Sequence, residues 1–230
     1  MSTLLVAYGA AGGAPPATME SLRVLADGTA RAIVGSPWPD GTPLDEAGVY
    51  ETTLAPGDLE ALRTLADDEP LRAAAGEHGP IRGDSGARTI SLGEDLTIRW
   101  GAFADPPSAV TAAEARLRDV LARVREHPVA VLRLRDGALS NPGTQPVSYR
   151  VELRTGDGDS LAAFHAATPT GPSHGELGPG ETVRIDPGQG RNAFARGALE
   201  VAVDDRPLAL DVFVVSQSAG PGFARGRTVG

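Results

Sequence analysis

The helical period of this chain stops at His127-Pro128, and that change divides the sequence into two parts of different character. Before it, apolar residues recur every three or four positions in two segments, which is the spacing of amphipathic helices. After it, short aliphatic runs alternate with clusters of Gly, Pro, Asn and Asp, which is typical of antiparallel strands joined by turns. We therefore expect an α+β domain at 1–128, a small antiparallel β-sandwich at 129–216 and a flexible tail at 217–230.

Two β-hairpins are predicted in the first part. Asp27-Gly28 separates the β-type runs 22–26 and 29–34, and it suits a two-residue type I′ turn because both central residues of that turn need positive φ. The second hairpin turns at a Gly-Glu-Asp sequence. The other strands expected in this part cover 3–8, 49–54, 88–92 and 96–100.

Two helices are predicted from apolar spacing. Pro56 suits the first turn of a short helix that ends near Asp67, and residues 70–87 are expected to be irregular. The longer helix begins with either Ser108 or Thr111 as its cap. Its apolar face is expected to contain Val110, Ala113, Leu117, Val120, Leu121 and Val124. Its exposed side is expected to carry the ion pairs Glu114–Arg118 and Asp119–Arg123.

The chain contains neither lysine nor cysteine, and all 21 of its basic residues are arginine. Schiff-base mechanisms and Walker-type phosphate loops need lysine, whereas thiol catalysis and zinc–thiolate sites need cysteine. We therefore exclude these four chemistries and expect no cofactor. The net charge of −9 argues against general nucleic-acid binding and anionic membrane surfaces, because both attract clustered positive charge.

The amino-terminal segment has no basic region, and its apolar run is shorter than that of a signal peptide. No stretch reaches the length of a membrane span. We therefore expect a cytoplasmic protein. The Ala-, Gly- and Arg-rich composition without lysine is typical of a GC-rich bacterial genome. Avoidance of lysine as a target for acylation or conjugation is the alternative explanation.

The segment Gly83-Asp84-Ser85-Gly86 matches the core of the motif around the nucleophile of trypsin-like serine proteases. That chemistry needs a histidine base and an orienting carboxylate, and His78 lies seven residues before Ser85. The protease family has its histidine much earlier in the chain, and Ala87 stands where the family has a further glycine. We interpret the segment as a turn that precedes a strand.

Three arginines surround the second predicted hairpin: Arg82, Arg88 and Arg99. They form an anion site if their guanidinium groups converge. The alternative is that arginines at alternating strand positions are solvated or paired with neighbouring carboxylates. The four histidines do not have the spacing of a metal-binding pair on a helix, so no metal site is predicted.

The proline-rich loop at 35–47 is a predicted contact surface, and the Gly-rich loop at 9–17 is a second one. Trp38 is flanked by two prolines, and an exposed tryptophan on a stiff loop is a common interaction anchor. The alternative is that Trp38 folds back onto a core with few large side chains. The predicted partner-binding residues are Trp38, Pro39, Asp40, Asp45 and Glu46.

The order of elements in residues 1–128, together with the Leu22–Val34 hairpin and the Pro56-Gly57-Asp58-Leu59 helix start, resembles small bacterial domains of the emfourin type. Those domains inhibit thermolysin-like metalloproteases, so the resemblance implies an inhibitor. Residues 129–216 resemble immunoglobulin-like accessory domains of bacteria, with Leu177-Gly-Pro-Gly-Glu181 as a typical turn. Neither resemblance assigns a functional residue, because likeness of fold does not transfer function.

Taken together, these patterns favour a non-catalytic protein-binding or scaffold protein that recognises another protein through loops of its first domain. A protease inhibitor is the first alternative. A carboxylate-dependent hydrolase of the glycosidase type is the second alternative, with Asp45 and Glu46 as candidate carboxylates.

Overall fold

The computed structural model describes residues 2–11, 19–35, 45–81, 86–101, 103–135, 138–156, 168–184, 192–203 and 206–216. These residues form three helices, a ten-stranded sheet and a four-stranded sheet, which confirms the predicted mixture of helices and strands. The chain divides into two compact units. The first contains Met1–Ile33 and Tyr50–His127, and the second contains Val34–Val49 and Pro128–Gly230.

The larger sheet has the strand order β12-β9-β8-β4-β3-β2-β1-β6-β7-β5. β1 pairs antiparallel with both β2 and β6, and β5 pairs parallel with β7. Both predicted hairpins are confirmed, as β2–β3 and β6–β7. The strands that enter the first unit are β1 (Leu4–Ala11), β2 (Met19–Leu25), β3 (Thr29–Val34), β4 (Asp45–Thr53), β5 (Gly76–His78), β6 (Ala87–Leu92) and β7 (Leu96–Gly101).

The turn of the first hairpin begins one residue earlier than predicted. The N–H of Gly28 donates to the carbonyl of Leu25 at 3.0 Å, so the four-residue turn covers 25–28. Gly28 has a φ of +91°, which favours glycine. Oδ1 of Asp27 accepts the N–H of Thr29 at 2.9 Å. That N–H would close a two-residue turn centred on Asp27-Gly28, so its capture by the carboxylate explains the shift.

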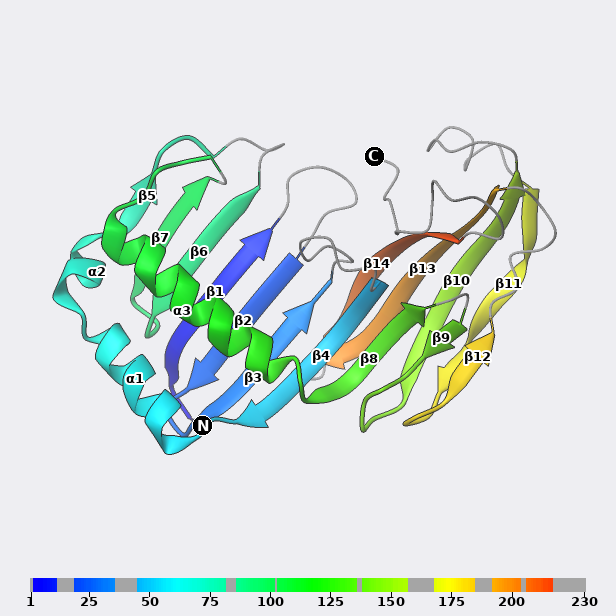
Figure 1. Ribbon diagram of the computed structural model, residues 1–230, viewed down its shortest axis with the longest axis horizontal. Coiled ribbons are helices and arrows are strands. Elements are labelled where there is room, and N and C mark those ends of the chain that lie inside the picture. Colours follow the sequence, from blue (N-terminus) through cyan, green and yellow to red (C-terminus); the bar gives the residue numbers. More distant parts are fainter. Residues whose placement is uncertain are drawn as a thin grey trace. The chain divides into compact units, whose positions relative to one another are not determined.

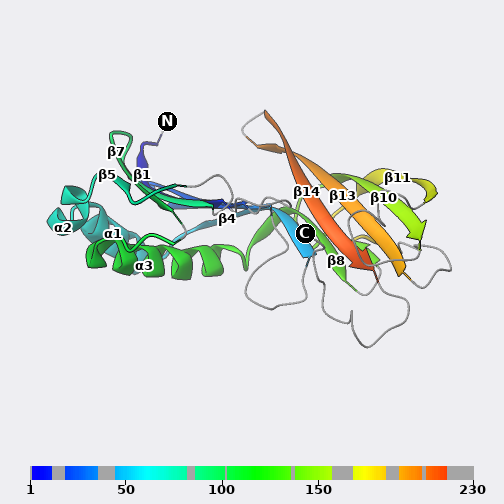
Figure 2. The same cartoon turned by 90° about the horizontal axis from the view of Figure 1, so that it is seen from above.

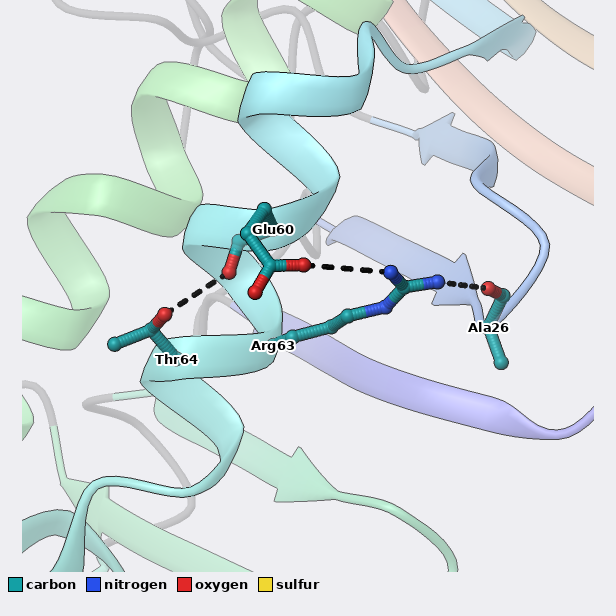
Figure 3. A network of polar contacts seen from close by, with 4 residues as sticks. All are labelled: Ala26, Glu60, Arg63 and Thr64. Atoms are coloured by element: carbon teal, nitrogen blue, oxygen red, sulfur yellow. Dashed lines mark hydrogen bonds and ion pairs between the residues drawn. The ribbon is translucent and has the colours of Figure 1, made fainter.

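The predicted short helix is confirmed as α1 (Pro56–Ala66), and it is tied to the turn of the first hairpin (Figure 3). Nη2 of Arg63 donates to the carbonyl of Ala26 at 3.1 Å, and Nη1 donates to the carboxylate of Glu60 at 3.4 Å. The hydroxyl of Thr64 donates to the carbonyl of Glu60 at 3.1 Å. The side chain of Arg63 therefore links helix and hairpin.

The segment 70–87, expected to be irregular, contains most of α2 (Glu69–Ala73) and all of β5. The carboxylate of Asp68 caps α2 by accepting the N–H of Leu71 at 2.8 Å, and Pro70 lies in the first turn. The prediction is wrong here because the helix is too short to have a recognisable apolar period. Its start signal, an Asp followed by a proline two residues later, is nevertheless present in the sequence.

The long helix is α3 (Ser108–Val124), and its cap and its exposed side differ from the prediction. Pro107 occupies the cap position, and no side chain caps the helix there. Glu114 is only 8% exposed, so the prediction that it lies on the exposed side is wrong. Arg123 forms an ion pair with Asp58 of α1, with 3.2 Å between Nη2 and Oδ1. The predicted apolar face is confirmed, with Val110, Ala113, Leu117, Val120, Leu121 and Val124 all buried.

All three helices lie on one face of the strands of the first unit (Figures 1 and 2). Alternate strand residues point towards them, and burial of each large aliphatic side chain there contributes about 1.5–3 kcal/mol. Trp100 is 1% exposed and lies in the core. The other buried apolar residues of these strands include Val6, Leu22, Val24, Ala30, Ala32, Ile90, Leu92 and Ile98.

The second unit contains the remaining strands. In the larger sheet, β8 (Pro128–Arg135) pairs with β9 (Ala138–Ser140), which pairs with β12 (Thr182–Arg184). The smaller sheet is antiparallel with the order β11-β10-β13-β14. Its strands are β10 (Val147–Gly156), β11 (Thr168–Leu177), β13 (Asn192–Val203) and β14 (Arg206–Ser216). The strand predicted at 161–166 and the tail lie outside the described residues, and the immunoglobulin-like sandwich stays a prediction.

Asn141 organises the connection between β9 and β10 in this unit. It is fully buried, and its amide nitrogen donates to the carbonyls of Gln145 at 2.8 Å and Leu177 at 2.9 Å. Its Oδ1 accepts the N–H of Gly143 at 2.9 Å. A Cβ at Gly143 would overlap the carbonyl of Val129, so glycine is required there. The amide therefore satisfies three backbone groups, in addition to the backbone hydrogen bonds that Thr144 and Gln145 donate to the carbonyl of Val129.

Candidate functional site

The predicted partner-binding residues lie before β4 or at its start. Asp45 is the first residue of β4. Glu46 follows it and is 4% exposed, with Oε2 2.5 Å from Nε of Arg133 on β8. This ion pair already engages the Glu46 carboxylate within the second unit. The remaining residues lie outside those that the structure describes, and their roles stay predictions: Trp38, Pro39 and Asp40.

Of the residues considered for a serine-protease site, Gly83, Asp84 and Ser85 lie outside the described ranges, whereas His78, Gly86 and Ala87 are described. His78 is on β5, and its Nε2 lies 2.7 Å from the carbonyl oxygen of Ala74. A carbonyl oxygen only accepts hydrogen bonds, so Nε2 carries a proton and donates it. In this conformation that nitrogen is not available as a general base.

The two described arginines of the predicted anion site lie on opposite faces of the β6–β7 hairpin. Arg88 is opposite Trp100 in the register, whereas Arg99 is opposite Thr89. Successive side chains of a strand point to opposite faces. The shared anion site, one of the two interpretations of these arginines, is therefore wrong for this pair, and Arg82 lies outside the described residues.

On the face covered by helices, Arg88 belongs to a polar cluster that contacts α3. The hydroxyl of Tyr8 donates to Oε1 of Glu114 at 3.0 Å, and Nε of Arg88 lies 3.3 Å from the same oxygen. Burial of Tyr8, then the charge of Glu114 and the hydrogen bond to it, raise the Tyr8 pKa, so the hydroxyl stays a donor. Glu20 and Arg125 form a second ion pair at 3.5 Å. These contacts hold α3 on the sheet.

The opposite face of β2, β1, β6 and β7, which we call the open face, has small and hydroxyl-bearing residues at its centre. One cross-strand row contains Arg23, Ala7, Ser91 and Thr97, and the next contains Ser21, Gly9, Thr89 and Arg99. β1 continues to Ala11, so Gly9 lies in a strand rather than in the predicted loop. A Cβ placed on Gly9 meets no atom within 4 Å, so a side chain would have room at this position.

Arg23 and Arg99 are exposed on the open face. Neither forms an ion pair with a residue that the structure describes, although Glu77 of β5 is opposite Arg99 in the register. The neighbouring β3 adds Arg31, whose Nε lies 2.7 Å from Oε2 of Glu51. The described strands thus place three arginines and two carboxylates on this side. The first unit as a whole has eleven arginines and sixteen Asp or Glu, a net charge of −5, whereas the described strands place one more arginine than carboxylate on the open face.

Sequence reasoning does not single out Arg23, and it places Gly9 in a predicted contact loop rather than in a strand. One useful signal is present: apolar and small polar residues alternate from Thr89 to Leu92, which predicts that one side of this strand faces solvent. The pairing of β1 with β6 joins strands that are far apart in the chain. A pairing between distant strands cannot be inferred from neighbouring residues in the sequence, so the open face can be recognised only from the structure.

Among the residues that the structure describes, no three His, Asp or Glu side chains come together as metal ligands. Within the same ranges, no helix is both long and apolar enough to span a bilayer. Comparisons with protein-family models, with curated proteins and with solved structures gave no match.

Proposed function

We propose that this protein is a non-catalytic binding protein whose first unit recognises another protein through the open face. The observation that carries the proposal is the contrast between the two faces of one sheet. Three helices cover one face, whereas no described helix covers the other (Figure 2). Small side chains at the centre of the open face let a partner approach closely, and exposed arginines at its borders supply charged contacts.

The polar clusters of the described residues support a structural role for the groups that otherwise suggest catalysis. Glu114 binds Tyr8 and Arg88, and Glu46 pairs with Arg133. General acid–base catalysis needs a group that can exchange a proton with a substrate. Carboxylates that are buried and held by a cation instead fasten one element to another.

The loop hypothesis is independent of the open face. Trp38→Ala is expected to weaken partner binding if the proline-rich loop also contacts the partner, and to leave it unchanged if the open face acts alone. The protease-inhibitor and hydrolase alternatives stay predictions, because no observation on the described residues favours either one. The expected cytoplasmic location and bacterial origin also stay predictions.

A steric block tests the proposal. Gly9→Gln places a side chain at the centre of the open face, where a Cβ meets no atom within 4 Å and the fold has room for it. Gly57→Gln is the matched control, because a Cβ on Gly57 of α1 also meets no atom within 4 Å. Tagged wild-type protein and both variants are used to capture partners from a lysate of the native host.

Proteins that are retained by the wild type and by Gly57→Gln, and lost from Gly9→Gln, support the proposal. Equal retention by all three proteins contradicts it, as does a wild type that retains nothing above the level of an unrelated tagged protein.

A further inference from the structure

We infer that the open face binds an acidic polypeptide segment, whose carboxylates are met by Arg23 and Arg99. This inference rests on the proposed function and adds the chemistry of the partner. It starts from the charge of the face, which is opposite in sign to that of the unit that carries it. A locally positive surface on an acidic unit attracts and orients negatively charged partners.

Arg23 has no carboxylate partner among the described residues around it. β2 and β3 are neighbours in the sheet, and each places an arginine on the open face. Glu51 is engaged by Arg31 at 2.7 Å, and Arg23 has no ion pair with any described residue. Glu51 is therefore already engaged, and the exposed guanidinium of Arg23 is available to a carboxylate from outside the unit.

The spacing of the two exposed arginines sets the length of the segment. They lie on β2 and β7, which are separated by β1 and β6, and they are offset by one cross-strand row. Strands lie about 4.8 Å apart and rise about 3.4 Å per residue, so the Cα atoms of Arg23 and Arg99 are about 16 Å apart. An extended chain covers that distance in about five residues. Two acidic residues spaced in this way therefore reach both arginines.

The residues between the arginines suit a polypeptide. Gly9 leaves the backbone of β1 accessible, and the hydroxyls of Ser91 and Thr97, 3.5 Å apart, can donate to or accept from a peptide backbone. The two cross-strand rows contain no aromatic side chain, whereas single-stranded nucleic acids are bound by stacking on aromatic rings. These features favour a protein segment over a nucleic acid.

Nuclear magnetic resonance of the arginine side chains tests the inference on the whole chain. A short peptide of Glu-Ser repeats is added to the nitrogen-15-labelled protein up to a peptide concentration of about 1 mM, at which weak binding is detectable. The same peptide with Gln in place of Glu is the matched control. Signals of the Nε–Hε groups are assigned with Arg23→Gln, Arg99→Gln and Arg116→Gln. Arg116 is exposed on α3 and serves as the reference arginine.

The expected result is a shift of the Arg23 and Arg99 signals with the Glu peptide, no shift of Arg116, and no shift with the Gln peptide. Equal shifts at all three arginines, or none at Arg23 and Arg99, overturn the inference. Signals that move with protein concentration alone identify a second copy of this chain as the occupant, which also overturns it.

Charge reversal separates this inference from the proposed function. The double variant Arg23→Glu/Arg99→Glu is compared with Arg116→Glu in the same lysate capture as Gly9→Gln. Loss of partners from Gly9→Gln and from the double variant, with retention by Arg116→Glu, supports both. If partners are lost from Gly9→Gln but kept by the double variant, the open face still binds a protein and the acidic segment is wrong. Retention by every variant contradicts both.

Discussion

The two faces of the sheet in the first unit are built from alternate residues of the same strands, yet their charged side chains differ in whether they form ion pairs. On the covered face, the charged residues that contact α3 are paired, as Arg88 is with Glu114 and Glu20 is with Arg125. On the open face, Arg23 and Arg99 are exposed and form no ion pair with a described residue. Helices cover the covered face, whereas none of the helices that the structure describes lies on the open face (Figure 2).

This difference follows from the surroundings of each arginine. A buried carboxylate such as Glu114 needs a nearby cation, because an uncompensated charge in a low-dielectric interior is costly. An exposed arginine such as Arg99 is solvated, and an ion pair adds little there. The covered face therefore contributes stability, whereas the proposed recognition depends on the exposed arginines Arg23 and Arg99 of the open face.

The largest expected effect is on the packing of the covered face. Leu117→Ala removes a fully buried side chain from α3 and leaves a cavity, so the free energy of unfolding is expected to fall by about 2–5 kcal/mol. Arg116→Ala, on the exposed side of the same turn, is expected to change it by less than about 0.5 kcal/mol. Denaturant titration followed by circular dichroism measures both. A similar loss in the two variants contradicts the assignment of the faces.

The next largest effect on the free energy of unfolding is expected from a comparison of two arginines on adjacent strands. Arg88→Ala leaves the Glu114 carboxylate without this cation, and the expected loss is about 1–3 kcal/mol. This loss is smaller than that for a fully buried pair, because the Arg88 side chain is 35% exposed and partly screened by solvent. Arg99→Ala is expected to change the free energy of unfolding by less than about 0.5 kcal/mol. Equal costs for the two substitutions would remove the distinction between the faces.

A third effect concerns alkaline pH. The pKa of Tyr8 is raised in the folded state, first by burial and then by Glu114, whereas an unfolded tyrosine titrates near about 10. Above that pH the folded state holds more protons than the unfolded state, so stability falls as the pH rises. The chain has no lysine or cysteine, so neither residue type contributes to the change in stability in this range.

Tyr8→Phe is expected to cost about 1–2 kcal/mol at neutral pH, where the hydrogen bond to Glu114 is lost. In return, the variant is expected to lose less stability than the wild type between pH about 9 and about 11. Tyr149→Phe, in the second unit, is the matched control. Parallel pH profiles for Tyr8→Phe and the wild type would contradict the proposed role of the hydroxyl.

The smallest effect is expected at Gly9. Gly9→Ala on the open face adds a methyl group where there is room, and it is expected to stabilise the first unit by less than about 1 kcal/mol. Gly28→Ala is expected to destabilise it by about 1 kcal/mol, since φ there is +91° and the new Cβ lies 3.3 Å from Cδ2 of Leu59. The two melting temperatures are compared with that of the wild type. Destabilisation by Gly9→Ala would indicate that the open face is packed.

The sequence predicts those parts of the fold that depend on local pattern. The first hairpin is marked by Asp27-Gly28, and the apolar face of α3 follows from helical spacing. The burial of Glu114 is missed because charged residues are usually exposed, so a glutamate beside an apolar stripe is assigned to the exposed side of the helix. Its partners, Tyr8 and Arg88, come from two distant strands and cannot be read from the helix.

The candidate site is less predictable than the fold. Arg99 is noticed in the sequence, but as part of an anion site with Arg88. The hairpin register, which places the two on opposite faces, decides against that site. Arg23 and Gly9 become neighbours of Arg99 on one face only through the β1–β6 pairing. The predicted contact at Trp38 lies outside the described residues and stays a prediction.

Coverage of the open face in the native environment can be measured directly. An arginine-selective reagent is applied to the protein in native-host lysate and to the purified protein, and modification of each arginine is quantified by mass spectrometry. If the open face binds a partner, Arg23 and Arg99 will react less in the lysate than in the purified protein, and Arg116 will react equally in both. Equal reactivity of all three arginines in the two conditions would contradict recognition through the open face.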